Sequence, residues 1–223
     1  MASKNTRAGA RNGGRLLDSL HVAKTSVRFE PFKTIFAQGD RCAAVMYITK
    51  GRVRLSVVSP GGKVAVVAVL RAGAFFGEGA LAGQRCRKLT AETMTGCTIA
   101  VVKTAEMRRR LHEESALSDW FRSHMLARNV RIEADLVAQL FNSSEKRLAR
   151  ALLLLARVDE HQSPRYALPK ISRNLLAQMS GTTRSRVDLL MNNFRKLGFL
   201  ERHSERDGGV QIHRSMLSVV LQD

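Results

Sequence analysis

The stretch Ser172–Lys196, SRNLLAQMSGTTRSRVDLLMNNFRK, decides the fold expected for the C-terminal third of the chain. It contains two short helical patterns separated by Gly181. Ala177 is small enough for two helices to approach, Gly181 suits a left-handed turn, and Val187 can bury the second helix against the first. The spacing predicts a helix-turn-helix.

The second helical segment, expected at about 184–197, begins with polar and basic residues. Thr183 suits the N-cap, and Arg184 and Arg186 then fall in the first turn, where arginine can form two hydrogen bonds with guanine or contact phosphate. The candidate DNA contacts are Ser172, Arg173, Thr182, Thr183, Arg184, Ser185 and Arg186. The alternative is a helical hairpin with solvated charges.

The segments around this motif predict a winged helix-turn-helix domain over residues 143–223. Leu148–Ala156 forms an apolar helix, and Pro164 and Pro169 mark a linker. A hairpin is expected from Phe199 to Ile212, through the turn Asp207-Gly208-Gly209.

A long amphipathic helix is expected before this domain, in residues 111–142. Its apolar residues recur at intervals of three, four or seven, which favours pairing of two copies in a coiled coil. The candidate dimer contacts are Phe121, Met125, Ile132 and Leu136, and Asn129 or Gln139 can set the register. The alternative is a helix packed on its own β-domain.

Residues 26–110 carry the pattern of short antiparallel strands. They are rich in Val, Ile, Phe and Thr and are interrupted every 8 to 12 residues by Gly or Pro-Gly. Examples are Val53–Val58, the turn Ser59-Pro60-Gly61-Gly62 and the run Val64–Leu70. This half is expected to be a sandwich or barrel.

Within the β-half, the sequence FFGEGAL at 75–81 is followed by Arg87. A Gly-led turn that opens a short helix offers backbone N–H groups to a phosphate, Arg87 can add a charge-assisted contact, and Glu78 can accept from a sugar hydroxyl. The alternative is a structural ion pair between Glu78 and Arg87. The candidate ligand residues here are Phe76, Gly77, Glu78, Gly79, Ala80, Arg87 and Lys88.

The composition narrows the classes of partner and chemistry. Lys and Arg total 37 against 19 Asp and Glu, a net charge of +18, which favours nucleic acid as a partner. Residues 1–25 are expected to form a basic, flexible tail, and residues 1–15 lack the apolar centre of a signal peptide, so we expect a cytoplasmic protein. Three scattered cysteines and the absence of paired His or Cys motifs predict no metal site.

The β-half and the C-terminal motif together resemble a known family. Ile35–Asp40, Met46-Tyr47-Ile48, Gly73, Phe76–Leu81 and Arg87 resemble the cyclic-nucleotide-binding domain. With the long helix and the winged helix-turn-helix, the chain resembles the bacterial CRP/FNR transcription factors over residues 26–222.

This resemblance implies an α+β chain with a β jelly-roll sensor domain, a central dimerisation helix and a winged helix-turn-helix. It implies a homodimeric regulator, not an enzyme, gated by cyclic AMP or cyclic GMP and acting with RNA polymerase on a near-palindromic operator. Glu78 would hold the ribose 2′-hydroxyl and Arg87 the cyclic phosphate, helped by amides near Gly77.

The sequence departs from the family pattern at several positions. Lys88 and Leu89 follow Arg87 where a Ser or Thr and an Ala are usual, and Ile132 and Glu133 replace a Thr-Ser pair that contacts the base. Asn129 and Glu133 are therefore added as ligand candidates, since a carboxylate at 133 can accept from guanine N1 and N2. In the recognition helix, Ser185 and Leu189 replace a Glu and an Arg.

Three other functions stay open at this point. The β-domain can be a scaffold without an effector or with a different one, which the Lys88-Leu89 departure favours. An enzyme acting on phosphate would need a nucleophile and base pair, a phosphate-binding loop or a metal cluster, and the sequence contains none that we recognise. A basic protein that binds RNA or membranes without sequence preference is the third.

Overall fold

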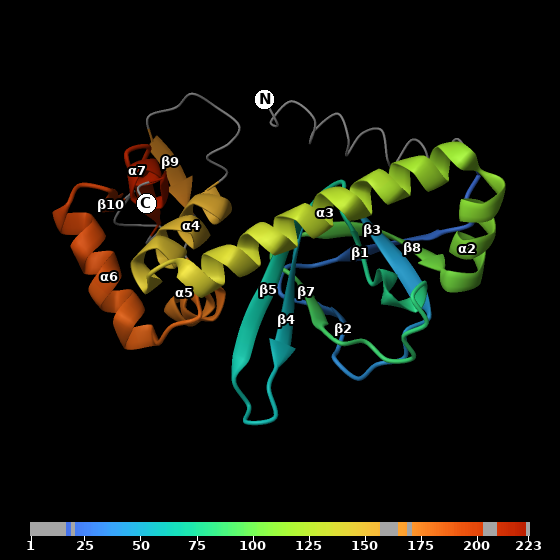
Figure 1. Cartoon of the computed structure of the whole chain (residues 1–223), viewed down its shortest axis with the longest axis horizontal. Coiled ribbons are helices and arrows are strands. Elements are labelled where there is room, and N and C mark those ends of the chain that lie inside the picture. The colour runs from blue at the N-terminus through green and yellow to red at the C-terminus, as the bar shows by residue number, and fades with distance from the viewer. Residues whose placement is uncertain (1–16, 19–20, 157–164, 169–170, 203–208, 222–223) are drawn as a thin grey trace. The chain divides into compact units, whose positions relative to one another are not determined.

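The computed structural model describes residues 17–18, 21–156, 165–168, 171–202 and 209–221. The chain divides into two compact units, Met1–Arg131 and Ile132–Asp223. Figure 1 shows the order of the helices and strands along the chain.

The first unit is a β-sandwich of two four-stranded antiparallel sheets. One sheet has the order β1-β8-β3-β6, with bounds Thr25–Phe29, Cys97–Lys103, Ala44–Lys50 and Phe75–Phe76. The other has the order β2-β7-β4-β5, with bounds Thr34–Phe36, Thr90–Thr93, Arg52–Val58 and Val64–Arg71. The predicted β-domain is confirmed, including the hairpin β4–β5.

Strand β3 is covered on both faces, because successive side chains of a strand point to opposite sides. Met46 and Ile48 belong to the core between the two sheets, together with Phe36, Val53, Leu55, Leu70, Phe76, Ala91, Cys97 and Ile99. Val45 and Tyr47 belong to a second core on the outer face of the β1-β8-β3-β6 sheet.

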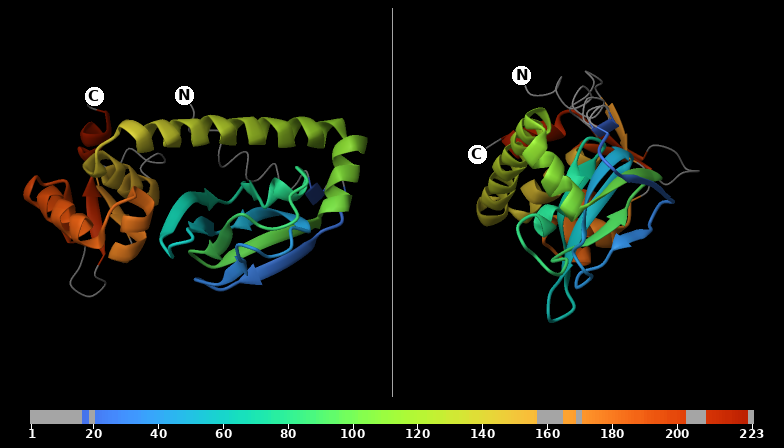
Figure 2. Two further views of the ribbon diagram at one scale, coloured as in Figure 1. Left: turned by 60° about the horizontal axis from the view of Figure 1, so that its bottom comes forward. Right: turned by 90° about the vertical axis from the view of Figure 1, so that its right-hand side faces the viewer.

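Two helices cover that outer face. Helix α2 (Thr104–Glu113) contributes Met107 and helix α3 (Ser115–Phe141) contributes Leu117, and both side chains are fully buried in the second core. The two views of Figure 2 show α2 turning into α3 beside the strands. A long helix is confirmed, but it starts later than expected, because residues 111–113 belong to α2; α3 has 27 residues and crosses the boundary between the units.

The second unit is the predicted winged helix-turn-helix. It contains α4 (Ser144–Ala156), α5 (Arg173–Ser180), α6 (Arg184–Lys196), α7 (Met216–Leu221) and a sheet of β9 (Arg165–Leu168), β11 (Val210–His213) and β10 (Leu200–Arg202). The apolar face of α4 is buried along Leu148–Ala156 as expected.

Two details of this unit bear on the sequence predictions. The hairpin is confirmed by the pairing of Leu200 with Ile212, while most of its expected turn lies outside the described residues. The interpretation of Pro164–Pro169 as a plain linker is wrong, because β9 lies between the prolines and pairs Tyr166 with Ile212. No helix in the described ranges is long and apolar enough to cross a membrane.

Candidate ligand site and nucleic-acid interface

The turn at Gly77 places a short helix beside the core of the β-domain. Phe76 is buried at the end of β6, and Gly77 follows with φ 74°, capping the 3-10 helix η1 (Glu78–Ala80). A Cβ atom at Gly77 would lie 2.5 Å from Nη1 of Arg87. Glycine is therefore required both by the backbone conformation and by the approach of this guanidinium.

Arg87 is a buried arginine with 5% exposure. Its Nη1 donates to the carbonyl of Gly77 and its Nη2 to the carbonyl of Ala44, each at 2.7 Å. The guanidinium carbon lies 4.3 Å from the ring centroid of Phe36. The Nε atom is buried and has no hydrogen-bond partner among the described residues.

Glu78 is paired with a residue that the sequence analysis did not single out. Its Oε1 accepts from Nη1 of Arg128 on α3 at 2.8 Å, whereas Oε2 is buried without a partner in the described part of the chain. The alternative of a Glu78–Arg87 ion pair is therefore wrong. Periodicity could have suggested Arg128, because it falls three residues after Met125 on the face of α3 that packs against the β-domain.

Arg108 on α2 contacts the C-terminal end of the segment 75–81 that contains Gly77 and Glu78. Its Nη2 donates to the carbonyls of Ala80 and Leu81 at 3.2 and 3.3 Å. Together with Arg128, which also reaches the carbonyl of Phe75 at 3.4 Å, it ties residues 75–81 to the two helices. Gly79 lies between these contacts, against the side chain of Gln84.

The positions where the sequence departs from the family pattern have different environments. Lys88 is exposed, while Leu89 packs against the core between the sheets. Asn129 is exposed on α3 next to Arg128. Glu133 is also exposed, but it belongs to the second unit, so the structure does not place it with Glu78 and Arg87.

The candidate dimer residues fall into two groups. Phe121 and Met125 pack against the second core of their own β-domain, with the rings of Phe121 and Phe75 5.0 Å apart. Ile132 and Leu136 are exposed by 52% and 57%. The first half of α3 thus follows the alternative interpretation, a helix packed on its own domain.

Helix α3 also carries an exposed apolar row, from Leu126 onward, that is not among the candidate dimer contacts. Four of its residues follow the alternating spacing of a coiled-coil seam and are exposed by 56–67%: Leu126, Val130, Val137 and Leu140. Periodicity alone could have found this row, but it could not tell which of two adjacent apolar rows the β-domain covers.

The local chemistry of the helix-turn-helix agrees with the sequence analysis. The Thr183 hydroxyl caps α6 by accepting from the Arg186 amide at 3.2 Å. Gly181 has φ 62° and ψ 40°, and Val187 is fully buried. Ser172 caps α5 by accepting from the Leu175 amide at 3.2 Å, a structural role beside its predicted DNA contact.

The remaining candidates divide into exposed and internally bonded residues. Arg184, Ser185 and Arg186 are exposed at the start of α6. Arg173 instead pairs through Nε with Asp188 at 3.0 Å and so joins α5 to α6. The Thr182 amide donates to the Ala177 carbonyl at 3.1 Å within the turn.

Two side chains near the end of α3 and the start of α4 hold this turn. Arg147 donates from Nε to the carbonyl of Ser180 and from Nη1 to the carbonyl of Asn142, each at 2.8 Å. A Cβ atom on Gly181 would lie 2.5 Å from the side-chain nitrogen of Gln139. Gln139, considered above as a register residue, thus lies against the helix-turn-helix.

His124 on α3 lies in the aromatic cluster of the β-domain, with ring centroids 5.7 Å from Phe75 and 6.1 Å from Trp120. Burial lowers the pKa of His124, and the positive charges of Arg128 and Arg131 lower it further. The neutral imidazole is therefore favoured next to the residue that pairs with Glu78.

The chemistry at Gly77 fits a cyclic nucleotide. The unpartnered Nε of Arg87 and Oε2 of Glu78 are a cationic donor and an anionic acceptor, and Arg87 is bonded to Gly77, the residue before Glu78. A phosphate oxygen would satisfy the first and a sugar hydroxyl the second. The described residues contain no group of three His, Cys, Asp or Glu side chains suited to a metal ion.

The comparisons with known proteins define the class. Residues 26–114 match the cyclic nucleotide-binding domain, and residues 146–215 match the Crp-like helix-turn-helix domain. These two matches describe a DNA-binding transcriptional regulator with a cyclic-nucleotide-binding domain.

Individual relatives identify the family. The chain is 30% identical to the global nitrogen regulator of Synechococcus elongatus, over 80% of this chain and 82% of that protein. It is 26% identical to the cAMP-activated global transcriptional regulator Vfr of Pseudomonas aeruginosa, over 82% and 88%. The c-di-GMP-responsive regulator CLP of Xanthomonas campestris shares the fold, with a TM-score of 0.76, 17% identity and coverage of 90% and 99%. The chain belongs to the CRP/FNR family of transcriptional regulators.

Proposed function

We propose that the chain acts in the cytoplasm as a homodimer on a near-palindromic operator, and that a cyclic nucleotide in the β-domain controls this binding. The exposed half of α3 would form the dimer contact, and Arg184, Ser185 and Arg186 would read the operator. RNA polymerase is the partner through which such a regulator would change transcription. The relatives include a cAMP-activated regulator, which supports a cyclic nucleotide as effector.

The observation that carries the sensor assignment is the pair of unsatisfied buried atoms beside Gly77. Nε of Arg87 and Oε2 of Glu78 are each charged-group atoms without a partner in the described structure. Leaving such atoms unpaired costs about 1–3 kcal/mol each. A ligand with a phosphate and a hydroxyl at the right separation would recover this free energy on binding.

Control of DNA binding would follow from the contacts of Glu78. Arg128 on α3 already binds one oxygen of the Glu78 carboxylate. A ligand that bound the other oxygen would therefore be connected to the long helix through Glu78. Amides at the start of η1, Arg87 and Lys88 would hold the phosphate. The ligand shifts the protein only if it binds one arrangement of α3 better than another.

A second candidate is a β-domain that serves as a scaffold without a nucleotide. The bonding of Arg87 favours it, because both terminal nitrogens are already satisfied at 2.7 Å by carbonyl groups. The exposed position of Lys88 and the burial of Leu89 agree with it.

Calorimetric titration of the full chain with cyclic AMP and cyclic GMP separates the two candidates. The sensor proposal expects close to one ligand per chain, with affinity lost in Glu78→Gln and in Arg87→Lys. Arg85→Ala, which removes an exposed cation two residues away, is the matched control and should bind normally. Absence of heat from a protein that dimerises and binds DNA would favour the scaffold.

The choice of base is proposed to depend on Glu133. If its carboxylate faces the bound base, it accepts from two guanine donors but from only one adenine donor, so cyclic GMP is favoured. Glu133→Gln should then lower the ratio of cyclic GMP to cyclic AMP affinity about tenfold, the effect of roughly one charged hydrogen bond. An unchanged ratio would remove Glu133 from the site.

A further inference from the structure

The positive charge of the chain is concentrated in the unit that lacks the helix-turn-helix. Residues 1–131 hold 23 of the 37 Lys and Arg residues and nine of the 19 acidic residues, a net charge of +14. Residues 132–223 hold the other 14 and ten, a net charge of +4. Most of the chain's net positive charge therefore lies outside the unit that contains the helix-turn-helix.

Ion pairing in the first unit leaves its net charge of +14 unchanged, because each pair removes one acid and one cation from the unpaired groups. Seven of the nine acids in the first unit are in ion pairs: Asp18, Glu78, Glu92, Glu106, Glu113, Glu114 and Asp119. Exposed cations such as Arg28 and Lys50 have no ion-pair partner among the described residues. Most of the charge left unpaired is therefore cationic, and Glu30 and Asp40 are the two acids of this unit outside these pairs.

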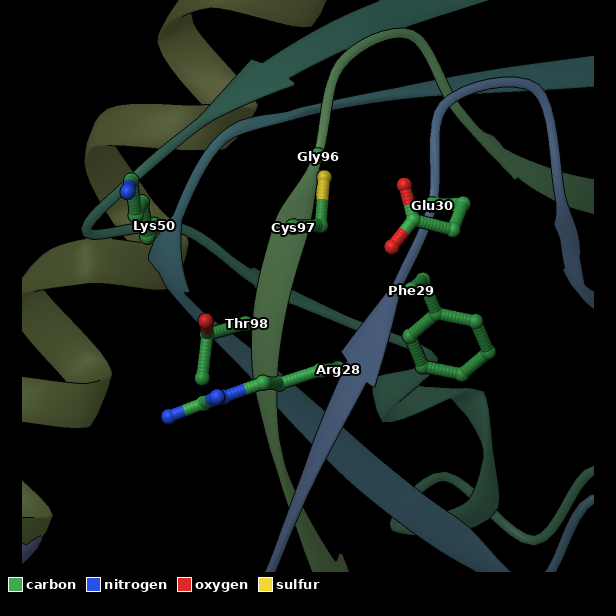
Figure 3. A pocket seen from close by; sticks show the side chains of 7 residues that line it. All are labelled: Arg28, Phe29, Glu30, Lys50, Gly96, Cys97 and Thr98. Carbon is green, nitrogen blue, oxygen red and sulfur yellow. The ribbon is translucent and has the colours of Figure 1, made fainter.

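Arg28 and Lys50 lie together on one face of the β1-β8-β3-β6 sheet. Both are in register with Thr98 of β8, Arg28 from β1 on one side and Lys50 from β3 on the other. They line an open groove of about 480 Å³. Figure 3 shows the two cationic side chains on the same side of β8 with Thr98 between them, and Glu30 on the opposite side.

The chemistry of this groove suits a phosphate backbone better than a protein surface. Ser26, on the same face of β1 as Arg28, and Thr49, next to Lys50, are exposed hydroxyl residues. Arg, Lys, Ser and Thr are the side chains that contact phosphate in DNA complexes. Half-buried Phe29 and exposed Glu30 also line the groove, but none of the exposed large apolar residues described in the first unit does, so the groove has few of the anchors of a protein interface.

We propose that the groove formed by Arg28, Thr98 and Lys50 binds the phosphate backbone of double-stranded DNA, as a second contact beside the helix-turn-helix. The inference rests on the proposed DNA binding of the chain, which brings DNA to the protein. A second weak site on the same ligand then acts at a high effective concentration. It would add affinity without base specificity, because backbone contacts carry no sequence information.

The test is the salt dependence of DNA binding by the full chain. Fluorescence anisotropy with a random-sequence 40-base-pair duplex between 50 and 250 mM KCl gives the slope of log affinity against log salt. Each lost phosphate contact reduces this slope by about 0.9. Arg28→Gln/Lys50→Gln should reduce it by roughly 1 to 2. The matched control, Arg41→Gln/Lys63→Gln, removes two other exposed cations of the same domain and should change it less.

Each outcome has a distinct meaning. A wild-type chain that binds no DNA contradicts the proposed function itself. A slope unchanged in Arg28→Gln/Lys50→Gln, or reduced equally by the control, overturns the groove and leaves the proposed function standing. Loss of transcription with purified polymerase at unchanged DNA affinity would assign the groove to a protein and also overturn the proposal.

A second measurement tests the contact directly. Lys50 should become less reactive toward acetylation, measured by mass spectrometry, when the duplex is added to the wild-type protein. Lys63, at the tip of the β4–β5 hairpin, provides the reference for an exposed lysine outside the groove. Equal reactivity of Lys50 with and without DNA would contradict the proposal.

Discussion

The site at Gly77 and the start of α6 both present arginines, but they use them in opposite ways. Arg87 is buried and bonded to two carbonyls of its own domain, whereas Arg184 and Arg186 are exposed on a capped helix. The β-domain site is thus held together by the side chain that a ligand would contact, and the helix-turn-helix leaves its arginines free for DNA. Binding at the first must compete with existing bonds, and binding at the second need not.

The largest effect is expected at Arg87. Arg87→Leu removes both carbonyl contacts and the packing on Phe36, so the first unit should lose about 3 kcal/mol of stability. Urea unfolding of the full chain measures it, with Arg184→Ala as the reference, which should change stability by less than about 0.5 kcal/mol. Equal stability of the two variants would contradict the structural role of Arg87 and its difference from Arg184.

The next effect is expected at Arg184, in DNA binding. If this arginine contacts a guanine, Arg184→Ala should weaken operator binding by about 1–3 kcal/mol and relax the preference at one base of each half-site. An operator selected from a random DNA pool, followed by titration of single-base variants, measures both. Uniform weakening at every position would instead identify a phosphate contact.

A smaller effect is expected from the cap of α6. Thr183→Ala removes the acceptor for the Arg186 amide and should destabilise the second unit by about 1 kcal/mol. Ser185→Ala, which removes a neighbouring exposed hydroxyl without a capping role in the described structure, should leave the unfolding midpoint almost unchanged. Identical midpoints would show that the cap does not prearrange the recognition helix.

The smallest effect is expected from pH at the β-domain. Because the pKa of His124 is lowered in the folded protein, its contribution to stability is present above about pH 6.5, the ordinary value, and is lost as the pH falls through the lowered value. Urea midpoints at pH 7.5 and 5 should differ more for the wild type than for His124→Gln. His112→Gln, at an exposed histidine on α2, should keep the wild-type difference.

The predictable parts of the molecule are those fixed by neighbouring residues. The helix-turn-helix follows from Ala177, Gly181 and Thr183, whose roles depend on contacts within about ten residues along the chain. The β4–β5 hairpin follows in the same way from its glycine-rich turn. Local conformational rules decide both, so one sequence is enough.

The unpredicted parts depend on contacts between distant residues. Glu78 and Arg128 are 50 residues apart, and no local rule selects this partner over Arg87. Periodicity identified the apolar faces of α3, but tertiary packing decides that Phe121 and Met125 face the β-domain. Strand β9 was missed because four residues between two prolines are too few for a pattern, and only pairing with β11 makes them a strand.

The two bonds of Arg147 have a mechanical consequence. One guanidinium joins the carbonyl of Asn142, just past α3, to the carbonyl of Ser180, just before the turn that leads into α6. Because the planar guanidinium is bonded to the end of α3 and to the turn before α6, these two helices can rotate little relative to each other. A rotation of the last turns of α3 is therefore transmitted to the recognition helix α6. The contact of Gln139 with Gly181 further restricts independent movement of the two helices.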